Sequence, residues 1–288
     1  MSTKRRNNSQ RTGAPQPDAP TPPPPVIENP ATDIFSFISP TEFVELPSKG
    51  VLYGEDHPLY ETDVLEIRHM TAKEEDILTS QALIKQGVAL DRLVDSLIVD
   101  KAVKASNLLV GDKNAVLVAA RMTGFGSEYK VGITCPVCVN ENTGEYDLST
   151  LAHKEVDLDQ NNTVQLPSGN YEITFPQYKN IAIEVKLLTG ADEKSIVKAR
   201  DKKKKAKGAD SLITDQLAAI IVRINEYTDP VSLKRFITEC PTKITREIRA
   251  VYDAIAPDID MTVDFECTEC AYEGKVGLPL TAEFFWPQ

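Results

Sequence analysis

The chain has 288 residues, of which 41% are hydrophobic, and its charged side chains leave a net charge of −11. This length and apolar content suffice for one large or two ordinary domains with a substantial core. The acidic balance argues against a nucleic-acid-binding protein, which usually presents a positive field. No stretch reaches the ~18 apolar residues of a membrane span, and the polar start Met1–Arg11 lacks the apolar core of a secretory signal.

The first 33 residues differ in composition from the rest of the chain. Eight prolines fall between Pro15 and Pro30, including the run Pro22–Pro25. Such a segment cannot bury apolar surface and favours polyproline II. We therefore expect residues 1–33 to be a disordered, proline-rich tail that acts as a tether. The alternative is that the tail is a ligand for a groove or anionic surface of a partner.

Residues 34–160 are predicted to form an N-terminal half that contains both strands and helices. The turn Leu46–Gly50 interrupts an extended segment, because Pro pre-sets φ in such a turn and Gly relieves strain. Thr71 and Glu74 have the spacing of a capping box, which predicts the start of a helix. The expected strands are Glu42–Tyr53, Val64–Ile67, Tyr129–Ile133 and Glu145–Leu148, and the expected helices run from Thr71 through Leu83, across Leu90–Leu97, and over Lys113–Met122.

Residues 161–288 are predicted to form a C-terminal half of the same kind. The basic run Lys198–Lys207 repels itself and is expected at a solvated helix end or loop. Pro241 and Pro257 delimit the last predicted helix. The expected strands are Tyr171–Phe175, Met261–Phe265 and Lys275–Leu280, and the expected helices are Asp192–Arg200, Leu212–Asn225, Val231–Glu239 and Thr242–Ile255. The class is α+β.

The two predicted halves have similar sequence features in the same order. Leu46–Gly50 has a counterpart in Leu166–Gly169, a strand follows each turn, helices follow each strand, and each half ends in a Cys-x-x-Cys hairpin. One interpretation is a duplication in which each copy supplies half of one metal site. The other is that two independent turns share a common composition, and both interpretations stay open.

Two Cys-x-x-Cys pairs, Cys135/Cys138 and Cys267/Cys270, each lie between two predicted strands. A two-residue gap lets both sulfurs of a turn point at one cation, and two such turns supply the four thiolates that suit tetrahedral Zn²⁺. The sequence therefore predicts one zinc ribbon that joins the middle of the chain to its end. The alternatives are disulfides or unrelated reduced thiols. Thioredoxin-like chemistry needs the motif at a helix N-terminus, and no helical pattern follows either pair.

A site of four thiolates has no open position for water or substrate, so its expected role is structural. Metal-binding free energy then becomes folding free energy. Reduced, metal-binding cysteines fit synthesis in the cytoplasm. The fifth cysteine, Cys240, precedes Pro241 at a predicted helix end and is expected to be a buried small hydrophobe.

Patterns typical of enzymes are not found in the sequence. Gly124-Phe125-Gly126 lacks the third glycine and the βαβ unit of a dinucleotide site, and no two of the three histidines are four residues apart. No nucleophile elbow or Cys-His pattern is visible. The sequence predicts a protein without catalytic activity and without a small-molecule substrate.

Several strings stand in a characteristic order along the chain. They are Leu46–Tyr53 (LPSKGVLY), His57–Tyr60 (HPLY), Leu65–Arg68 (LEIR), Met70–Leu78 (MTAKEEDIL), Leu109–Ala115 (LVGDKNA) with Ala120-Arg121, Leu278–Leu280 (LPL) and Glu283–Pro287 (EFFWP). Together they resemble the T4-type bacteriophage baseplate hub protein family over roughly residues 42 to 288. The resemblance implies a structural or assembly component of the hub of a contractile-tail baseplate, with other baseplate proteins as partners. Such a protein is expected in the host cytoplasm during assembly, and two alternatives stay open: it is retained in the virion tail baseplate, or it acts only as an assembly factor.

The last aromatic residues, Phe284, Phe285 and Trp286, carry much apolar area close together. They are expected to pack back over the zinc hairpin, and the alternative is an exposed anchor for a partner. The alternative function is a zinc-ribbon regulator that binds nucleic acid through Lys198–Lys207 and the basic N-terminus. A metal-dependent hydrolase would need an open zinc position, which four cysteines do not leave.

Overall fold

Short antiparallel strands and helices alternate along the chain, and together they give the mixed α+β class that the sequence predicts. The structure is a computed structural model that describes residues 40–154, 156, 162–178, 181–205 and 211–285. The predicted tail, residues 1–33, and Trp286 lie outside these residues. Buried side chains from both predicted halves form one continuous hydrophobic core. The division into domains at residue 160 stays a prediction.

The N-terminal half begins with two strands that pair antiparallel, with Thr41 opposite Arg68. The capping box at Thr71 starts a helix as predicted, but the helix ends at Thr79 and not at Leu83. Ser80 adopts an extended conformation, and its side chain accepts a hydrogen bond from the N–H of Leu83, so it starts a second helix. The elements are β1 (Thr41–Glu45), β2 (Val64–Arg68), α1 (Ala72–Thr79), α2 (Gln81–Lys85), α3 (Ala89–Leu97), α4 (Val110–Phe125), β3 (Glu128–Thr134) and β4 (Glu141–Asp147).

The C-terminal half contains a four-stranded antiparallel sheet with the order β5-β6-β7-β8. The predicted helix Leu212–Asn225 is wrong at its end, because the helix stops at Ile220 and Ile221–Ile224 form strand β8. Three consecutive β-branched residues from Ile220 favour the extended state, and β8 pairs with β7. The elements are β5 (Thr163–Gln165), β6 (Tyr171–Phe175), β7 (Ile181–Val185), α5 (Gly190–Lys205), α6 (Leu212–Ile220), β8 (Ile221–Ile224), α7 (Pro230–Glu239), α8 (Thr242–Ile255), β9 (Thr262–Glu266) and β10 (Glu273–Gly277).

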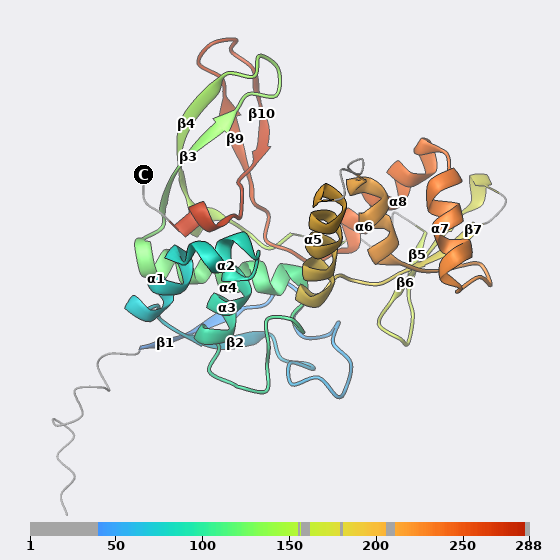
Figure 1. Cartoon of the computed structure of the whole chain (residues 1–288), viewed down its shortest axis with the longest axis horizontal. Coiled ribbons are helices and arrows are strands. Elements are labelled where there is room, and N and C mark those ends of the chain that lie inside the picture. The colour runs from blue at the N-terminus through green and yellow to red at the C-terminus, as the bar shows by residue number, and fades with distance from the viewer. Residues whose placement is uncertain (1–39, 155, 157–161, 179–180, 206–210, 286–288) are drawn as a thin grey trace, which may run out of the picture. The chain divides into compact units, whose positions relative to one another are not determined.

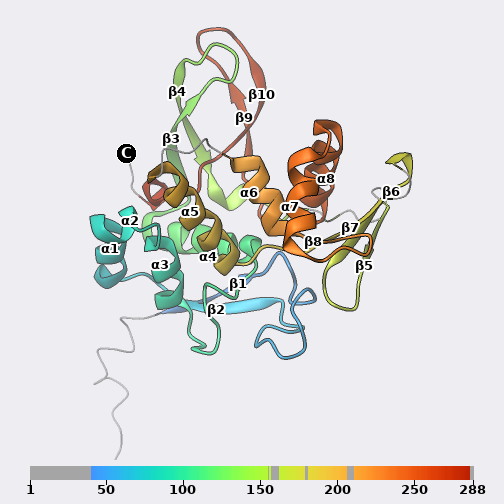
Figure 2. The ribbon, with the colours of Figure 1, turned by 45° about the vertical axis from the view of Figure 1, so that its right-hand side comes forward.

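The start of α4, the start of α5 and residues Pro257–Asp258 form a junction between the two halves, which we call the seam. Gly111 lies so close to the backbone of Pro257 that a Cβ atom would stand 2.0 Å from its carbonyl oxygen. Gly190 makes the reciprocal approach, since its Cβ would stand 2.2 Å from the carbonyl oxygen of Ala105. Glycine therefore allows each half to contact the backbone of the other. Figures 1 and 2 both show α5 beside the N-terminal end of α4.

Polar groups add to the contact across the seam. The N–H of Val110 donates to the carbonyl of Leu188 at 3.0 Å, and the N–H of Gly190 donates to the carbonyl of Leu108 at 2.9 Å. Lys113 on α4 is 6% exposed and forms an ion pair with Glu193 on α5. Backbone hydrogen bonds and one ion pair thus join the halves at the seam.

The turn Leu46–Gly50 is held against the first turn of α4. The N–H and the hydroxyl of Ser48 donate to the Asp112 carboxylate at 3.0 and 2.6 Å, and the Tyr53 hydroxyl donates to it at 2.6 Å. Burial raises the pKa of Asp112, although these hydrogen bonds oppose that effect. Two of the strings that carry the family resemblance therefore meet at one buried carboxylate.

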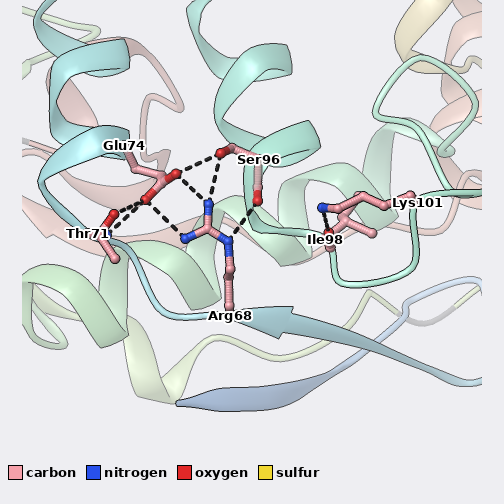
Figure 3. A network of polar contacts seen from close by, with 6 residues as sticks. All are labelled: Arg68, Thr71, Glu74, Ser96, Ile98 and Lys101. Carbon is pink, nitrogen blue, oxygen red and sulfur yellow. Dashed lines mark hydrogen bonds and ion pairs between the residues drawn. The ribbon is translucent and has the colours of Figure 1, made fainter. Parts of the chain in front are cut away.

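A second buried carboxylate joins β2, α1 and α3 inside the N-terminal half (Figure 3). Glu74 is fully buried and forms an ion pair with Arg68 at 2.6 Å. It also accepts hydrogen bonds from the hydroxyls of Ser96 and Thr71, each at 2.6 Å. Burial opposes ionisation of Glu74, but the bonds from Arg68, Ser96 and Thr71 outweigh it and lower the pKa to about 2.

Candidate metal centre

Two hairpins, β3–β4 and β9–β10, carry the cysteine pairs at their turns, and we call them together the hairpin pair. They lie side by side at the top of Figure 1, although more than a hundred residues separate them in the chain. As predicted, each Cys-x-x-Cys motif lies between two paired strands. The strands β4 and β10 begin at Glu141 and Glu273, earlier than the predicted Glu145 and Lys275.

The two cysteine turns have the same backbone conformation. In the first, the N–H of Cys135 donates to the carbonyl of Asn140 at 2.8 Å, and the N–H of Val139 donates to the carbonyl of Cys135 at 3.0 Å. Val139 adopts a left-handed φ of 63°. In the second turn, the N–H of Cys267 donates to the carbonyl of Tyr272 at 2.9 Å, and the N–H of Ala271 donates to the carbonyl of Cys267 at 3.0 Å. Ala271 adopts a left-handed φ of 51°.

The four predicted ligands come together in one cluster. The sulfur atoms of Cys135, Cys138, Cys267 and Cys270 all lie within 4.8 Å of one another, and all are free thiols. The Sγ atoms of Cys135 and Cys270 are 3.7 Å apart, and those of Cys138 and Cys267 are 3.5 Å apart. Tetrahedral zinc with bonds of ~2.3 Å would separate sulfurs by ~3.8 Å. The donor set and its spacing therefore suit a closed four-thiolate metal site.

The cluster pairs a buried cysteine of one turn with an exposed cysteine of the other. Cys135 and Cys267 are buried, whereas Cys138 and Cys270 are exposed. The N–H of Cys270 lowers the pKa of Cys267 to about 6, despite partial desolvation. For Cys135, desolvation is outweighed by the N–H groups of Cys138 and Val137, which lower its pKa. Each turn thus favours the thiolate form of its first cysteine, which is the form that binds metal.

One residue outside the four cysteines connects the two turns. Asn142 on β4 is buried, with 7% of its surface exposed. Its Oδ1 atom accepts hydrogen bonds from the N–H and the hydroxyl of Thr268, and its Nδ2 atom lies 3.6 Å from the Cys267 sulfur. The sequence gives no signal for this role, because asparagine is common near turns and its partners are more than a hundred residues away.

The base of the first hairpin is fixed by a buried arginine that sequence reasoning also missed. Arg121 on α4 donates to the carbonyls of Phe284, Gly126 and Glu128 at 3.0, 2.6 and 3.0 Å. Phe284 and Phe285 are fully buried, and the ring of Phe284 packs edge-on against Tyr129 at 4.8 Å. The two phenylalanines therefore pack inside the protein, against α4 and the base of the first cysteine hairpin.

The remaining candidates lie away from the cysteine cluster. Cys240 follows directly after α7 and is half-buried at the edge of the core, not fully buried as predicted. Lys198 and Lys202 are exposed on α5, so the basic run falls at the end of a helix as predicted. Residues 206 and 207 of the run lie outside the described residues. Among the described helices, none is long and apolar enough to cross a membrane.

The fold and the cluster define a mixed α+β protein whose halves are joined by a candidate four-thiolate metal site. Comparison with protein families matches residues 40–286 to the family described as T4 bacteriophage base plate protein. The chain belongs to this family, which points to a structural component of a phage baseplate. No curated protein and no solved structure matches the chain.

Proposed function

We propose that the protein is a component of the central hub of a contractile-tail baseplate and that it acts without catalysis, by binding other baseplate proteins. The observation that carries this proposal is the family match, which extends over almost all of the described residues. The candidate site agrees with it, because four cysteines around one ion leave no position for a substrate. We further propose that the protein is made in the host cytoplasm and then joins the tail baseplate.

We also propose that Cys135, Cys138, Cys267 and Cys270 hold one structural Zn²⁺. Zinc suits four thiolates, and the cross-hairpin sulfur separations of 3.5 and 3.7 Å fit its tetrahedral geometry. Elemental analysis of protein purified without chelator should find about one zinc per chain. Cys267→Ser should lose the ion, whereas Cys240→Ser, which changes a cysteine outside the cluster, should keep it. Protein that contains no metal while its hairpins keep full protection from hydrogen exchange would contradict the zinc proposal.

The charge of the hairpin pair favours a protein partner over nucleic acid. The strands of both hairpins carry more acidic than basic side chains, so the hairpin pair would repel the phosphates of a nucleic acid. The described strands carry two lysines, Lys130 and Lys275, against the carboxylates Glu128, Glu141, Glu145, Asp147, Asp264, Glu266 and Glu273.

A binding experiment separates the proposed function from the nucleic-acid alternative. The full-length protein, co-expressed with the other baseplate proteins of its phage, should co-purify with at least one of them at moderate salt, since apolar contact carries such interfaces. Mass spectrometry of purified virions should find the chain in the tail. Binding to DNA with a steep salt dependence, together with no binding to baseplate proteins, would favour the regulator instead.

The division into two halves is a further part of the proposal. We propose domains at 34–160 and 161–288 that arose by duplication, each with one half of the metal site. The matching cysteine turns and the reciprocal glycine contacts of the seam support this. Apart from the cysteine hairpins, the two halves differ in their sheets, since the first has the two-stranded sheet β1-β2 and the second has the four-stranded sheet β5-β6-β7-β8.

A further inference from the structure

The two cysteine turns are similar in backbone but not in their surroundings. Asn142 stands four residues after Cys138, and its carboxamide contacts the opposite turn. The matching position, four residues after Cys270, is Gly274, which has no side chain. The second turn is therefore held by the first, and no reciprocal contact of this kind exists at Gly274.

The carboxamide of Asn142 uses both of its ends. Oδ1 accepts hydrogen bonds from the Thr268 N–H at 2.9 Å and from the Thr268 hydroxyl at 2.7 Å. Nδ2 donates to the Asn140 carbonyl at 3.2 Å and is within 3.6 Å of the Cys267 sulfur. Thr268 directly follows Cys267, so the side chain fixes both the backbone and the sulfur of that ligand.

We infer that Asn142 is a positioning residue of the metal centre, which holds the second cysteine turn against the first and donates a hydrogen bond to the thiolate of Cys267. The inference rests on the proposed zinc site. Asn142 already holds the second cysteine turn in place, so less conformational entropy is lost when the turn binds the metal. The side-chain N–H of Asn142 also stabilises negative charge on sulfur, which matters because four thiolates around Zn²⁺ keep a net charge of −2.

The measurement that tests the inference is zinc affinity, determined on the full chain by competition with a chromophoric chelator. Asn142→Ala should weaken zinc binding by about 10- to 100-fold, the range found for residues that support metal ligands. Asn142→Asp preserves the side-chain volume and the acceptor for Thr268 but replaces the N–H donor with a negative charge, so we expect a loss at least as large. The control is Asn140→Ala, an exposed asparagine on the same turn, which should bind zinc within about twofold of wild type.

A spectroscopic measurement separates positioning of the sulfur from general support of the fold. In the Co²⁺-substituted protein, the sulfur-to-cobalt charge-transfer band should shift in Asn142→Ala and Asn142→Asp, because Cys267 loses its donor. Thr268→Val removes one hydrogen bond to Asn142 without removing the donor to sulfur. This variant should therefore leave the band in place and cause a smaller loss of affinity.

Three different outcomes would contradict the inference. If wild type binds zinc but both Asn142 variants bind it within twofold and keep the cobalt band, Asn142 has no positioning role. If wild type binds neither Zn²⁺ nor Co²⁺ through its thiols, the zinc proposal fails and the inference fails with it. A loss of affinity with an unshifted band would reduce Asn142 to a support of the hairpins and would also refute the donor role.

Discussion

The seam and the hairpin pair both join the two halves, but they do so by different means. At the seam, glycines bring the backbones into contact beside the continuous core, and buried Lys113 pairs with the partly exposed Glu193. The second hairpin has little core of its own: strand β10 contains no buried residue, and β9 contains one, Phe265. In the first hairpin, only β3 carries a row of buried apolar side chains, those of Tyr129, Val131 and Ile133. Two-stranded hairpins are marginal without further packing. The seam should therefore be stable by itself, whereas the hairpin pair should depend on the proposed metal ion.

The largest effect on stability is expected from Gly111→Ala at the seam. A Cβ atom there would meet the backbone of Pro257, so we expect a loss of about 4 kcal/mol or more, or failure to fold. Helix propensity alone predicts the opposite sign, because alanine is favoured over glycine by ~1 kcal/mol inside a helix. Chemical unfolding gives the free energy. Gly54→Ala is the control, since its Cβ would have no neighbour within 4 Å. If Gly111→Ala were as stable as wild type, the close contact between the backbones of Gly111 and Pro257 would not be needed for stability.

Removal of the metal should affect the other junction and leave the seam intact. Chelation should lower the stability of the hairpin pair by several kcal/mol, since metal binding contributes directly to folding. Hydrogen exchange should become fast in β3, β4, β9 and β10, while α4 stays protected. Cys267→Ser should show the same pattern and should no longer respond to chelator. Simultaneous loss of protection in α4 would mean that the two junctions are one cooperative unit.

A third test concerns the base of the hairpin pair, where no metal is involved. Arg121→Met keeps much of the apolar volume but leaves the carbonyls of Phe284, Gly126 and Glu128 without their donor. Unsatisfied buried groups cost ~1–3 kcal/mol each, so we expect a total loss of roughly 3 kcal/mol, with partial compensation by water. Proteolysis at the C-terminal segment should become faster. In chelated wild type this segment should stay protected, because Arg121 still holds it.

The smallest expected effect lies within the N-terminal half, away from both junctions. Glu74 has a folded pKa of about 2 against an ordinary value of 4.5. Because the pKa is lowered, the stabilisation is present above pH 4.5 and is lost as the pH falls towards 2. Its size is on the order of 2–3 kcal/mol. Glu74→Gln should remove most of this pH dependence in urea unfolding, and substitution of the exposed Glu75 should not. An unchanged profile would show that the network of Figure 3 contributes little.

The features that could be predicted from sequence are those that depend on neighbouring residues. Helix α8 has the predicted bounds because prolines stand before and after it, and β6 has them because its apolar residues alternate. The four cysteines could be found because two residues separate each pair. Strand β7 and the packing site of Phe284 could not be predicted, since both depend on residues that are distant in sequence and meet only on folding. The same holds for Asn142, whose partners in the second turn are 125 and 126 residues away.

The wide separation of the two cysteine turns has a consequence for the timing of synthesis. While the chain is being translated, Cys135 and Cys138 are available long before Cys267 and Cys270, and two thiolates are only half of the cluster. The cluster can close only after Cys270 has left the ribosome. Closure therefore distinguishes a chain translated past this residue from a prematurely terminated one, and only the former could present both hairpins in their joined form to the next protein in an assembly.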